Sequence, residues 1–285
     1  MVGALSQPSG LRGDAGSIST TRGIRTTRIE LVGVLQHVRP IRRSAMSVTK
    51  IVPLTNVGLL SGAMKRAQAR PIGLPGLVAM YGPSGYGKSA AAAFAANQHR
   101  CYYTECRDTW SKKAFLLAIL RDMSILPGRT LSEMVDQIAV QLSASRRPLI
   151  VDDVQYLLDK ATANVLTDIY NASEGTIVLI GEERVPASLQ RLERLHNRVL
   201  EWVPAQPATI EDIRQLASES YPALKFGDDL LADLNRVTKG CLRRIAVNLY
   251  RVQSEAAAMM LDYVDMAAWG SRSWFTGEAP SRRGH

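Results

Sequence analysis

One short run, from Gly82 to Ser89, constrains this chain more than any other segment. It reads Gly-Pro-Ser-Gly-Tyr-Gly-Lys-Ser and fills every fixed position of the pattern G-x-x-x-x-G-K-[ST]. The residues on either side fit a strand, a loop and a helix in that order, because 77–81 is apolar and 90–96 is rich in alanine. An ordinary surface turn would need no such flanks. The chain is therefore predicted to bind the phosphates of a nucleotide where a buried strand meets a helix.

Each residue type in the run has a chemical reason. The glycines let backbone N–H groups surround phosphate oxygens, Lys88 is expected to place its charge on the β and γ phosphates, and Ser89 is expected to offer its hydroxyl to Mg²⁺. The residues of this segment that are predicted to contact the nucleotide are Gly82, Pro83, Ser84, Gly85, Tyr86, Gly87, Lys88, Ser89 and Ala90.

A second motif follows at 149–153, where an apolar run ends in two carboxylates. Asp152 is expected to hold Mg²⁺, directly or through water, and Asp153 to orient or deprotonate the attacking water. Aspartate is one carbon shorter than the glutamate more usual at the position of Asp153, which predicts slow hydrolysis. The alternative is that both aspartates only cap the helix that follows.

Strand and helix patterns alternate through the first two thirds of the chain. Apolar strands are expected over 77–81, 101–105, 149–153 and 176–181, with helices over 56–69, 111–123, 130–145, 164–173 and 185–197. This alternation predicts an α/β fold with a parallel sheet covered on both faces. Beyond 207 only helical patterns remain, over 209–220, 228–237, 242–254 and 256–268. We expect an α/β domain over 48–206, a small helical domain over 207–268 and a flexible tail over 269–285.

The first 47 residues differ in composition from the rest. Eight of the 35 Lys and Arg residues, but two of the 26 acids, fall within the first 50 positions, although the whole chain carries a net charge of +9. This segment is predicted to be a disordered basic arm, or an artefact of a start site placed before Met46. Its composition also suits a transit peptide or a DNA-binding arm.

Several other classes of protein are not expected. No apolar stretch reaches the roughly 18 to 20 residues needed to cross a bilayer. The cysteines, Cys101, Cys106 and Cys241, have neither zinc-site spacing nor the even number of a disulfide framework, which favours a reducing cytoplasm. The four histidines are scattered and indicate no metal cluster.

Three charged residues outside the two motifs are further candidates for the phosphate site. Glu182 follows the fourth apolar strand, where a catalytic role and a surface role are both open. Arg198 is a candidate arginine finger directed into a neighbouring subunit, and Arg243 a candidate to reach the γ-phosphate of its own subunit. Arg194 and Arg244 compete with them, and a solvated helix face is the alternative for each arginine.

Basic clusters suggest nucleic-acid contacts. Aromatic residues make up 6% of the chain, which offers little for base stacking, so contacts to the phosphate backbone are expected instead. Solvated surface is the alternative. The candidates are Arg107, Lys112, Lys113, Arg146 and Arg147.

Taken together, the motifs from Met80 to about Ser254 resemble the AAA+ ATPases, in particular the branch that contains phage Mu transposition protein B. In this comparison 181–183, 195–199 and 240–244 resemble the sensor 1, arginine-finger and sensor 2 regions. The resemblance implies an AAA+ P-loop NTPase core with a C-terminal helical lid, ATP and Mg²⁺ as cofactors, and a homo-oligomeric ring or helical filament. It also implies nonspecific binding of double-stranded DNA, delivery of that DNA to a transposase, and a cytoplasmic location in a bacterial host. Asp153 and Glu182 depart from the family pattern, which puts efficient hydrolysis in doubt.

Two other hypotheses remain open at this stage. One is a secretion ATPase of the ExeA type, which shares much of the core but normally carries a membrane span and a wall-binding domain. The other is a scaffold protein that binds ATP without hydrolysing it and recruits a partner through its helical domain.

Overall fold

The computed structural model describes residues 52–158 and 161–278. The predicted arm over 1–47 lies outside these residues, as do positions 279–285 of the predicted tail. Within the described residues, no helix is both long and apolar enough to cross a membrane.

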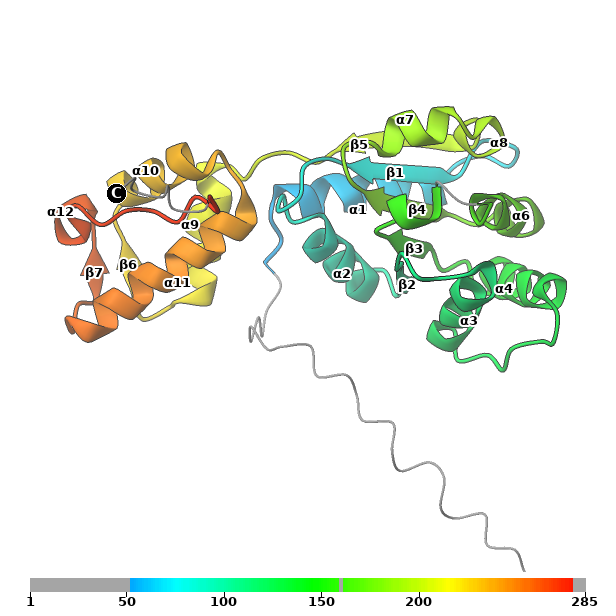
Figure 1. Ribbon diagram of the computed structural model, residues 1–285, viewed down its shortest axis with the longest axis horizontal. Coiled ribbons are helices and arrows are strands. Elements are labelled where there is room, and N and C mark those ends of the chain that lie inside the picture. The colour runs from blue at the N-terminus through cyan, green and yellow to red at the C-terminus, as the bar shows by residue number, and fades with distance from the viewer. Residues whose placement is uncertain (1–51, 159–160, 279–285) are drawn as a thin grey trace, which may run out of the picture. The chain divides into compact units, whose positions relative to one another are not determined.

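The central element is a five-stranded parallel sheet with the order β2-β3-β4-β1-β5 (Figure 1). Its strands are β1 (Leu77–Tyr81), β2 (Tyr102–Glu105), β3 (Leu149–Asp152), β4 (Ile177–Gly181) and β5 (Val199–Pro204). The predicted α/β class and parallel sheet are thus confirmed. The sequence did not predict β5, because its residues include Glu201 and are mostly half-buried, whereas β1, β3 and β4 are continuous apolar runs.

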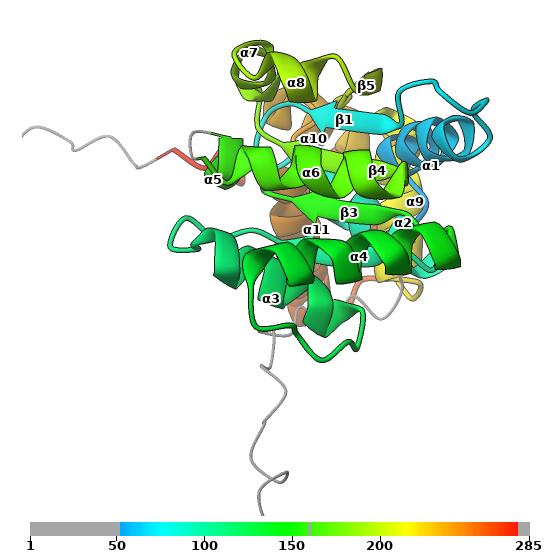
Figure 2. The same ribbon diagram turned by 90° about the vertical axis from the view of Figure 1, so that its right-hand side faces the viewer.

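Helices cover both faces of the sheet because alternate strand residues point to opposite sides. Val78 and Met80 pack in one cluster with α1 (Thr55–Gln68) and α2 (Lys88–Gln98). Leu77 and Ala79 pack on the other side. The helices on that side are α3 (Lys112–Asp122), α4 (Leu131–Ser145), α5 (Gln155–Leu158), α6 (Ala163–Ser173), α7 (Val185–Gln190) and α8 (Glu193–His196) (Figure 2).

One predicted helix of the core is broken in two. The sequence pattern predicts a single helix over 185–197, but Leu192 leaves helical geometry with φ −111° and ψ 67°. Its backbone N donates to the carbonyl of Leu189 at 2.9 Å, which closes a tight turn between α7 and α8. The spacing of apolar residues does not predict this turn, because Leu189 and Leu195 on either side of it pack in the same core.

The C-terminal region is mainly helical, with α9 (Ile210–Ser220), α10 (Asp228–Thr238), α11 (Leu242–Ala258) and α12 (Met266–Trp269). A two-stranded parallel sheet joins β6 (Lys225–Phe226) to β7 (Tyr263–Val264), which the sequence did not predict. The predicted helix over 256–268 is wrong: α11 continues to Ala258, the chain turns at Met260 with φ +54°, and β7 follows.

The segment after α12 packs against the helices before it. The rings of Trp269 and Trp274 stack at 4.9 Å between centroids. Trp274 Nε1 donates to Asp233 Oδ2 at 2.8 Å, and the backbone N of Phe275 donates to Asn248 Oδ1 at 2.8 Å. Positions 274 and 275, which the sequence assigns to the tail, are therefore tied to α10 and α11.

Candidate nucleotide-binding site

The loop between β1 and α2 has the backbone that the glycine spacing requires. Gly85 and Gly87 have φ of +87° and +80°, values that residues with a Cβ rarely adopt. Gly87 is also the residue before α2, so the loop leads directly into the N-terminus of an 11-residue helix. The free N–H groups at the N-terminus of α2 and the dipole of this helix favour binding of an anion there.

Lys88 is held at the centre of this loop. Its side chain is 9% exposed, and Nζ donates to the carbonyls of Gly82 at 2.7 Å and Pro83 at 2.8 Å. Burial lowers the pKa of Lys88 below its ordinary value, while the charges of Asp152 and Glu182 act in the opposite direction. The carboxyl ends of β3 and β4 thus bring both predicted carboxylates within electrostatic range of Lys88.

Asp152 lies at the end of β3 and is 1% exposed. Its Oδ2 accepts a hydrogen bond from the Tyr103 hydroxyl at 2.8 Å, and its Oδ1 accepts one from the backbone N of Asp153 at 2.9 Å. Burial raises the pKa of Asp152, and hydrogen bonds from Tyr103 and Ser89 oppose this rise. A carboxylate beside the Ser89 hydroxyl is a donor set that suits a hard cation.

These donors are too few to hold a metal alone. Among the residues that the structure describes, no group of three or more His, Cys, Asp and Glu side chains can form a metal site. Mg²⁺ is usually bound by one or two carboxylates together with substrate phosphates and water. Asp152 and Ser89 fit that mode, in which nucleotide and metal bind together.

Asp153 is positioned by a residue that the sequence reasoning missed. It adopts φ +53°, and its Oδ1 accepts a hydrogen bond from Gln155 Nε2 at 3.1 Å. The Gln155 Oε1 is buried and has no hydrogen-bond partner among the described residues. A Cβ on Gly181 would approach this oxygen to 2.6 Å, so glycine at the end of β4 makes room for the glutamine. The sequence feature that could have revealed Gln155 is an amide side chain two residues after the second aspartate.

Glu182 is the first residue after β4 and is exposed. Because β4 pairs with β1 so that Gly181 faces Tyr81, Glu182 follows its strand at the same level as the phosphate loop follows β1. Its charge acts on Lys88. A role in the reaction therefore remains a prediction that the position allows.

The start of α11 contacts the phosphate loop directly. The backbone N of Arg243 donates to the carbonyl of Gly85 at 3.1 Å, and Cys241 Sγ lies 3.8 Å from the same oxygen. The side chain of Arg243 is exposed. This contact brings the predicted sensor arginine, from a distant part of the chain, to the loop.

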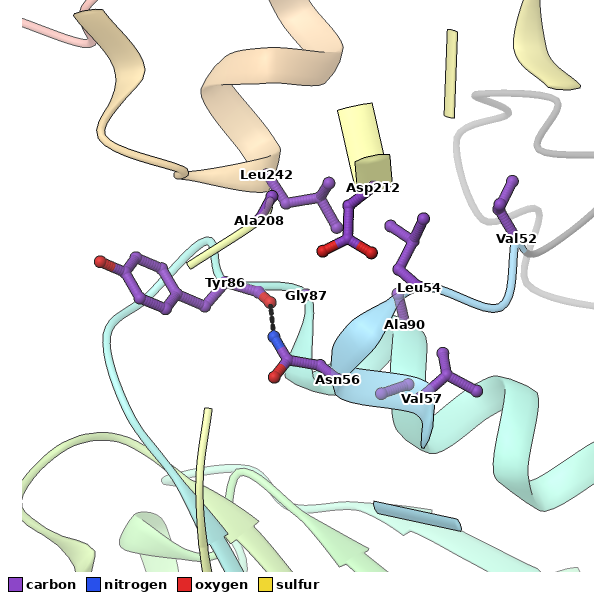
Figure 3. A pocket seen from close by; sticks show the side chains of 11 residues that line it. Val52, Leu54, Asn56, Val57, Tyr86, Gly87, Ala90, Ala208, Asp212 and Leu242 are labelled. Carbon is purple, nitrogen blue, oxygen red and sulfur yellow. Dashed lines mark hydrogen bonds between the residues drawn. The ribbon is translucent and has the colours of Figure 1, made fainter. Parts of the chain in front are cut away.

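A pocket lies beside the loop, lined by eleven residues from α1, α2, α9 and α11 and from the segments before them (Figure 3). Asn56 lies in the first turn of α1 and does not cap it, because α1 begins at Thr55 after Leu54. Asn56 Nδ2 instead donates to the carbonyls of Tyr86 and Gln206, both at 2.8 Å, and its Oδ1 accepts from the Gln206 backbone at 2.8 Å. One buried amide thus fixes the phosphate loop to the segment after β5.

Arg198 lies at the opposite edge of the sheet from the phosphate loop. Its carbonyl accepts from the backbone N of Leu77 at 3.0 Å, at the start of β1, whereas the loop follows the end of β1. Its guanidinium donates to Asn171 Oδ1 at 2.7 Å and to the carbonyl of Arg194. Arg198 therefore lies away from the loop of its own subunit, and its role in a neighbouring subunit stays a prediction.

The five candidate DNA contacts do not form one surface. Arg107, Lys112 and Lys113 follow the carboxyl end of β2, whereas Arg146 and Arg147 precede β3 at the amino edge of the sheet. Arg147 packs over the Tyr102 ring at 4.0 Å and donates to the carbonyl of Arg100. The two groups therefore lie at opposite ends of the neighbouring strands β2 and β3.

The contact between the loop and α11 gives a testable prediction. A Cβ on Gly85 would lie 2.7 Å from Cys241 Sγ, with φ at +87°. We expect Gly85→Ala to destabilise the fold by about 1 to 3 kcal/mol more than the control below, because its Cβ clashes with Cys241, and to weaken nucleotide binding by displacing α11. Gly73→Ala is the matched control, because Gly73 has φ +88° and nothing within 4 Å of its added Cβ. Denaturant unfolding and nucleotide titration of both variants test this, and equal behaviour of the two would contradict it.

Comparisons with known proteins agree with this geometry. Residues 73–189, which run from just before β1 into α7, match the model of a family described as an AAA domain. No curated protein matches the chain by sequence.

Solved structures with the same fold include three AAA+ ATPases. The ORC2 protein of Aeropyrum pernix, in ADPNP and ADP complexes, has a TM-score of 0.58 at 13% identity, covering 74% of this chain and 64% of that one. The ORC1 protein of Aeropyrum pernix in complex with DNA has a TM-score of 0.54 at 15% identity, covering 73% and 61%. The Holliday junction branch migration motor RuvB of Thermotoga maritima has a TM-score of 0.53 at 17% identity, covering 79% and 70%.

At these identities the likeness concerns the fold. This chain spans less than two thirds of the length of either archaeal protein. It has an AAA+ P-loop NTPase fold with a parallel α/β core and a helical C-terminal region. The transposition branch indicated by the sequence motifs stays a prediction.

Proposed function

We propose that this protein is an ATP-hydrolysing switch that assembles on double-stranded DNA. The observation that carries the proposal is the convergence of Lys88, Asp152 and the first turn of α11 on one phosphate-binding loop. When a helix from a distant part of the chain contacts such a loop, a change of the bound nucleotide can shift the conformation of the C-terminal region.

ATP is proposed to bind with its phosphates on 82–89. Lys88 then exchanges its bonds to the Gly82 and Pro83 carbonyls for the β and γ phosphate oxygens, and Arg243 is placed to approach from α11. Asp152 and Ser89 would hold Mg²⁺, which would neutralise charge on the phosphates.

Hydrolysis transfers the γ-phosphoryl group to water and yields ADP and phosphate. Asp153 is proposed to orient that water and accept its proton, held by Gln155 in the position observed. The short side chain of Asp153 and the unusual Glu182 favour slow turnover in the isolated protein. Turnover would then depend on assembly, which supplies a residue from a neighbour.

Arg198 is proposed to be that residue. It lies at the edge of the sheet opposite its own loop, so a ring or helical filament of subunits would direct it to the loop of the next subunit. Its present bonds to Asn171 and Arg194 hold it on the surface, where a neighbour can displace them.

DNA is proposed to bind through the basic residues at the carboxyl edge, Arg107, Lys112 and Lys113. Lys112 and Lys113 open α3, and Arg107 lies over the Trp110 ring at 5.9 Å, so all three belong to one short segment. Contacts of this kind neutralise phosphates and carry no sequence information. The ORC1 structure in complex with DNA and the RuvB motor share this fold and support DNA as the partner. Delivery of the bound DNA to a transposase is proposed from the sequence resemblance alone.

An experiment on the shared site tests the assembly. Arg198→Ala is expected to keep ATP affinity but to lower DNA-stimulated hydrolysis about 1,000-fold, the effect typical of an arginine finger. Arg191→Ala is the matched control, because Arg191 is an exposed arginine at the end of α7 and is not a candidate for the arginine finger. Mixing Arg198→Ala with Asp153→Asn subunits should restore part of the activity, since some interfaces then hold one intact site. Unchanged hydrolysis by Arg198→Ala would contradict the proposal.

A further inference from the structure

The amino edge of the sheet carries exposed basic residues that the proposed function does not use. They are Lys65 in the last turn of α1, Arg100 just after α2, and Arg146 and Arg147 just after α4. Arg100 and Arg147 come shortly before β2 and β3, which are neighbours in the sheet. We call these four residues the basic strip.

Contacts between neighbouring segments make the strip continuous. Arg147 donates to the carbonyl of Arg100, and its guanidinium lies over the Tyr102 ring at 4.0 Å. Arg147 therefore holds Arg100 in place. Burial, and after it the charge of Lys65, lower the pKa of His99, the residue before Arg100. The strip thus runs from the end of α1 across the end of α2 to the end of α4.

The segments that form the strip contain no acidic residue. No Asp or Glu occurs over 52–104, which includes α1 and α2, or over 137–151, which includes the end of α4. Among the residues that the structure describes, no carboxylate forms an ion pair with Lys65, Arg100 or Arg146. Neighbouring like charges without acidic partners create a positive potential that attracts a polyanion.

Two of the arginines occupy backbone positions that favour glycine. Arg100 has φ +53° and Arg146 has φ +56°, each close after the last residue of a helix. Glycine or asparagine is usual at such positions, because a Cβ is unfavourable there. The helix dipole favours a positive charge at a helix C-terminus, but this effect is small at exposed sites and is screened by salt. The fold itself therefore gains little from arginine at these two positions.

The chemistry of the strip matches the phosphate backbone of double-stranded DNA. Guanidinium and ammonium groups bind phosphate oxygens, and such contacts need no particular base sequence. Proteins that bind single strands add exposed aromatic rings on which unpaired bases stack. The Tyr102 ring is only 3% exposed and lies beneath Arg147, so it offers no such platform.

We propose that the basic strip is a second DNA-binding surface, with Lys65, Arg100 and Arg146 as its phosphate contacts, and that it binds duplex DNA without nucleotide. The phosphate loop follows β1 at the carboxyl edge, whereas the strip lies at the amino edge. Buried residues such as Ala95 of α2 and Leu142 of α4 fix these helices in the core, so the charges are in place with or without ATP. The inference rests on the proposed function for its choice of duplex DNA as the partner.

Fluorescence anisotropy of a labelled duplex, titrated with nucleotide-free protein at a series of salt concentrations, tests the strip. The variant carries Arg100→Gln and Arg146→Gln, which remove two charges but keep long polar side chains. We expect binding about 10- to 100-fold weaker than that of the wild type. The slope of log K against log salt should be shallower by about 2, because two phosphate contacts are lost. Wild-type affinity and slope in this variant would overturn the proposal.

Two controls separate DNA binding from net charge and from stability. A variant with Arg214→Gln and Arg236→Gln removes the same charge from α9 and α10 and should bind as the wild type does. An equal loss of binding in this variant would overturn the proposal. A variant with Arg100→Gly and Arg146→Gly suits the positive φ of both positions, so it should lose binding without a lower denaturant midpoint. If binding fell only where the midpoint also fell, the arginines would be structural and the proposal would be overturned.

Failure of the inference and failure of the proposed function give different results. Lys112→Gln with Lys113→Gln, at the carboxyl edge, should weaken the binding that ATP adds and leave nucleotide-free binding unchanged. If the nucleotide-free wild type does not bind the duplex, or binds it through Lys112 and Lys113, while ATP still produces assemblies on DNA, only the second surface is rejected. If ATP adds no binding to that of the nucleotide-free protein, the proposed function fails and the strip stands.

Discussion

Lys88→Ala is expected to lower the affinity for ATP by about 100-fold or more and to abolish hydrolysis. Lys88 lies near the carboxylates of Asp152 and Glu182, so its removal leaves negative charge facing a triphosphate that carries several negative charges of its own. Titration of the purified variant with ATP, together with a phosphate-release assay, measures both losses.

A control separates this effect from a general loss of positive charge. Lys65→Ala removes an exposed lysine from the last turn of α1 and should leave ATP affinity unchanged. Retention of wild-type affinity by Lys88→Ala would mean that the loop does not bind phosphates, and the account of the site would fail with it.

Asp153→Asn is expected to lower hydrolysis by about 100- to 10,000-fold while ATP affinity changes little. The amide keeps the size of the side chain and its contact with Gln155, but it cannot accept the proton of the attacking water. Phosphate release measured at saturating ATP reports this loss directly. The variant should also remain on DNA longer once ATP is bound, since release is proposed to follow hydrolysis.

Asp168→Asn, which changes an exposed aspartate on α6, is the matched control and should hydrolyse ATP at the wild-type rate. If the wild-type protein hydrolysed ATP no faster than the Asp153→Asn variant, the proposed reaction would be contradicted. That result would favour the scaffold hypothesis, in which ATP is bound without turnover.

The sequence was sufficient for the features that depend on neighbouring residues. The loop 82–89 and the pair Asp152 and Asp153 could be placed because each follows a continuous apolar strand, and both lie at the carboxyl edge of the sheet in the structure. The starts of the helices predicted over 130–145 and 209–220 are equally local, because capping boxes at Thr130 and Thr209 open α4 and α9.

The features that were missed depend on contacts between distant segments. Asp212 bonds to Thr55 across 157 positions, and Asn56 bonds to Gln206 across 150. Neither the type of these residues nor their spacing in the sequence predicts such a pairing. The contact of Arg243 with Gly85 is another example, since the sequence predicted that Arg243 reaches the γ-phosphate but not that its backbone touches the loop.

Basic residues were the least predictable part of the site. Arg146 and Arg147 look equivalent to Lys112 and Lys113 as clusters in the sequence, but the path of the chain puts the two pairs at opposite edges of the sheet. Arg147 also packs on Tyr102. The local sequence therefore does not distinguish a candidate DNA contact from a structural arginine, whereas the path of the chain through the sheet does.

Binding to double-stranded DNA with ATP, with ADP and without nucleotide, at two salt concentrations and with electron microscopy of the products, tests the central claim most directly. The account predicts rings or filaments on DNA with ATP alone, and affinity that falls steeply as salt rises because phosphate contacts dominate. Tight ATP binding with no DNA association in any nucleotide state would contradict it.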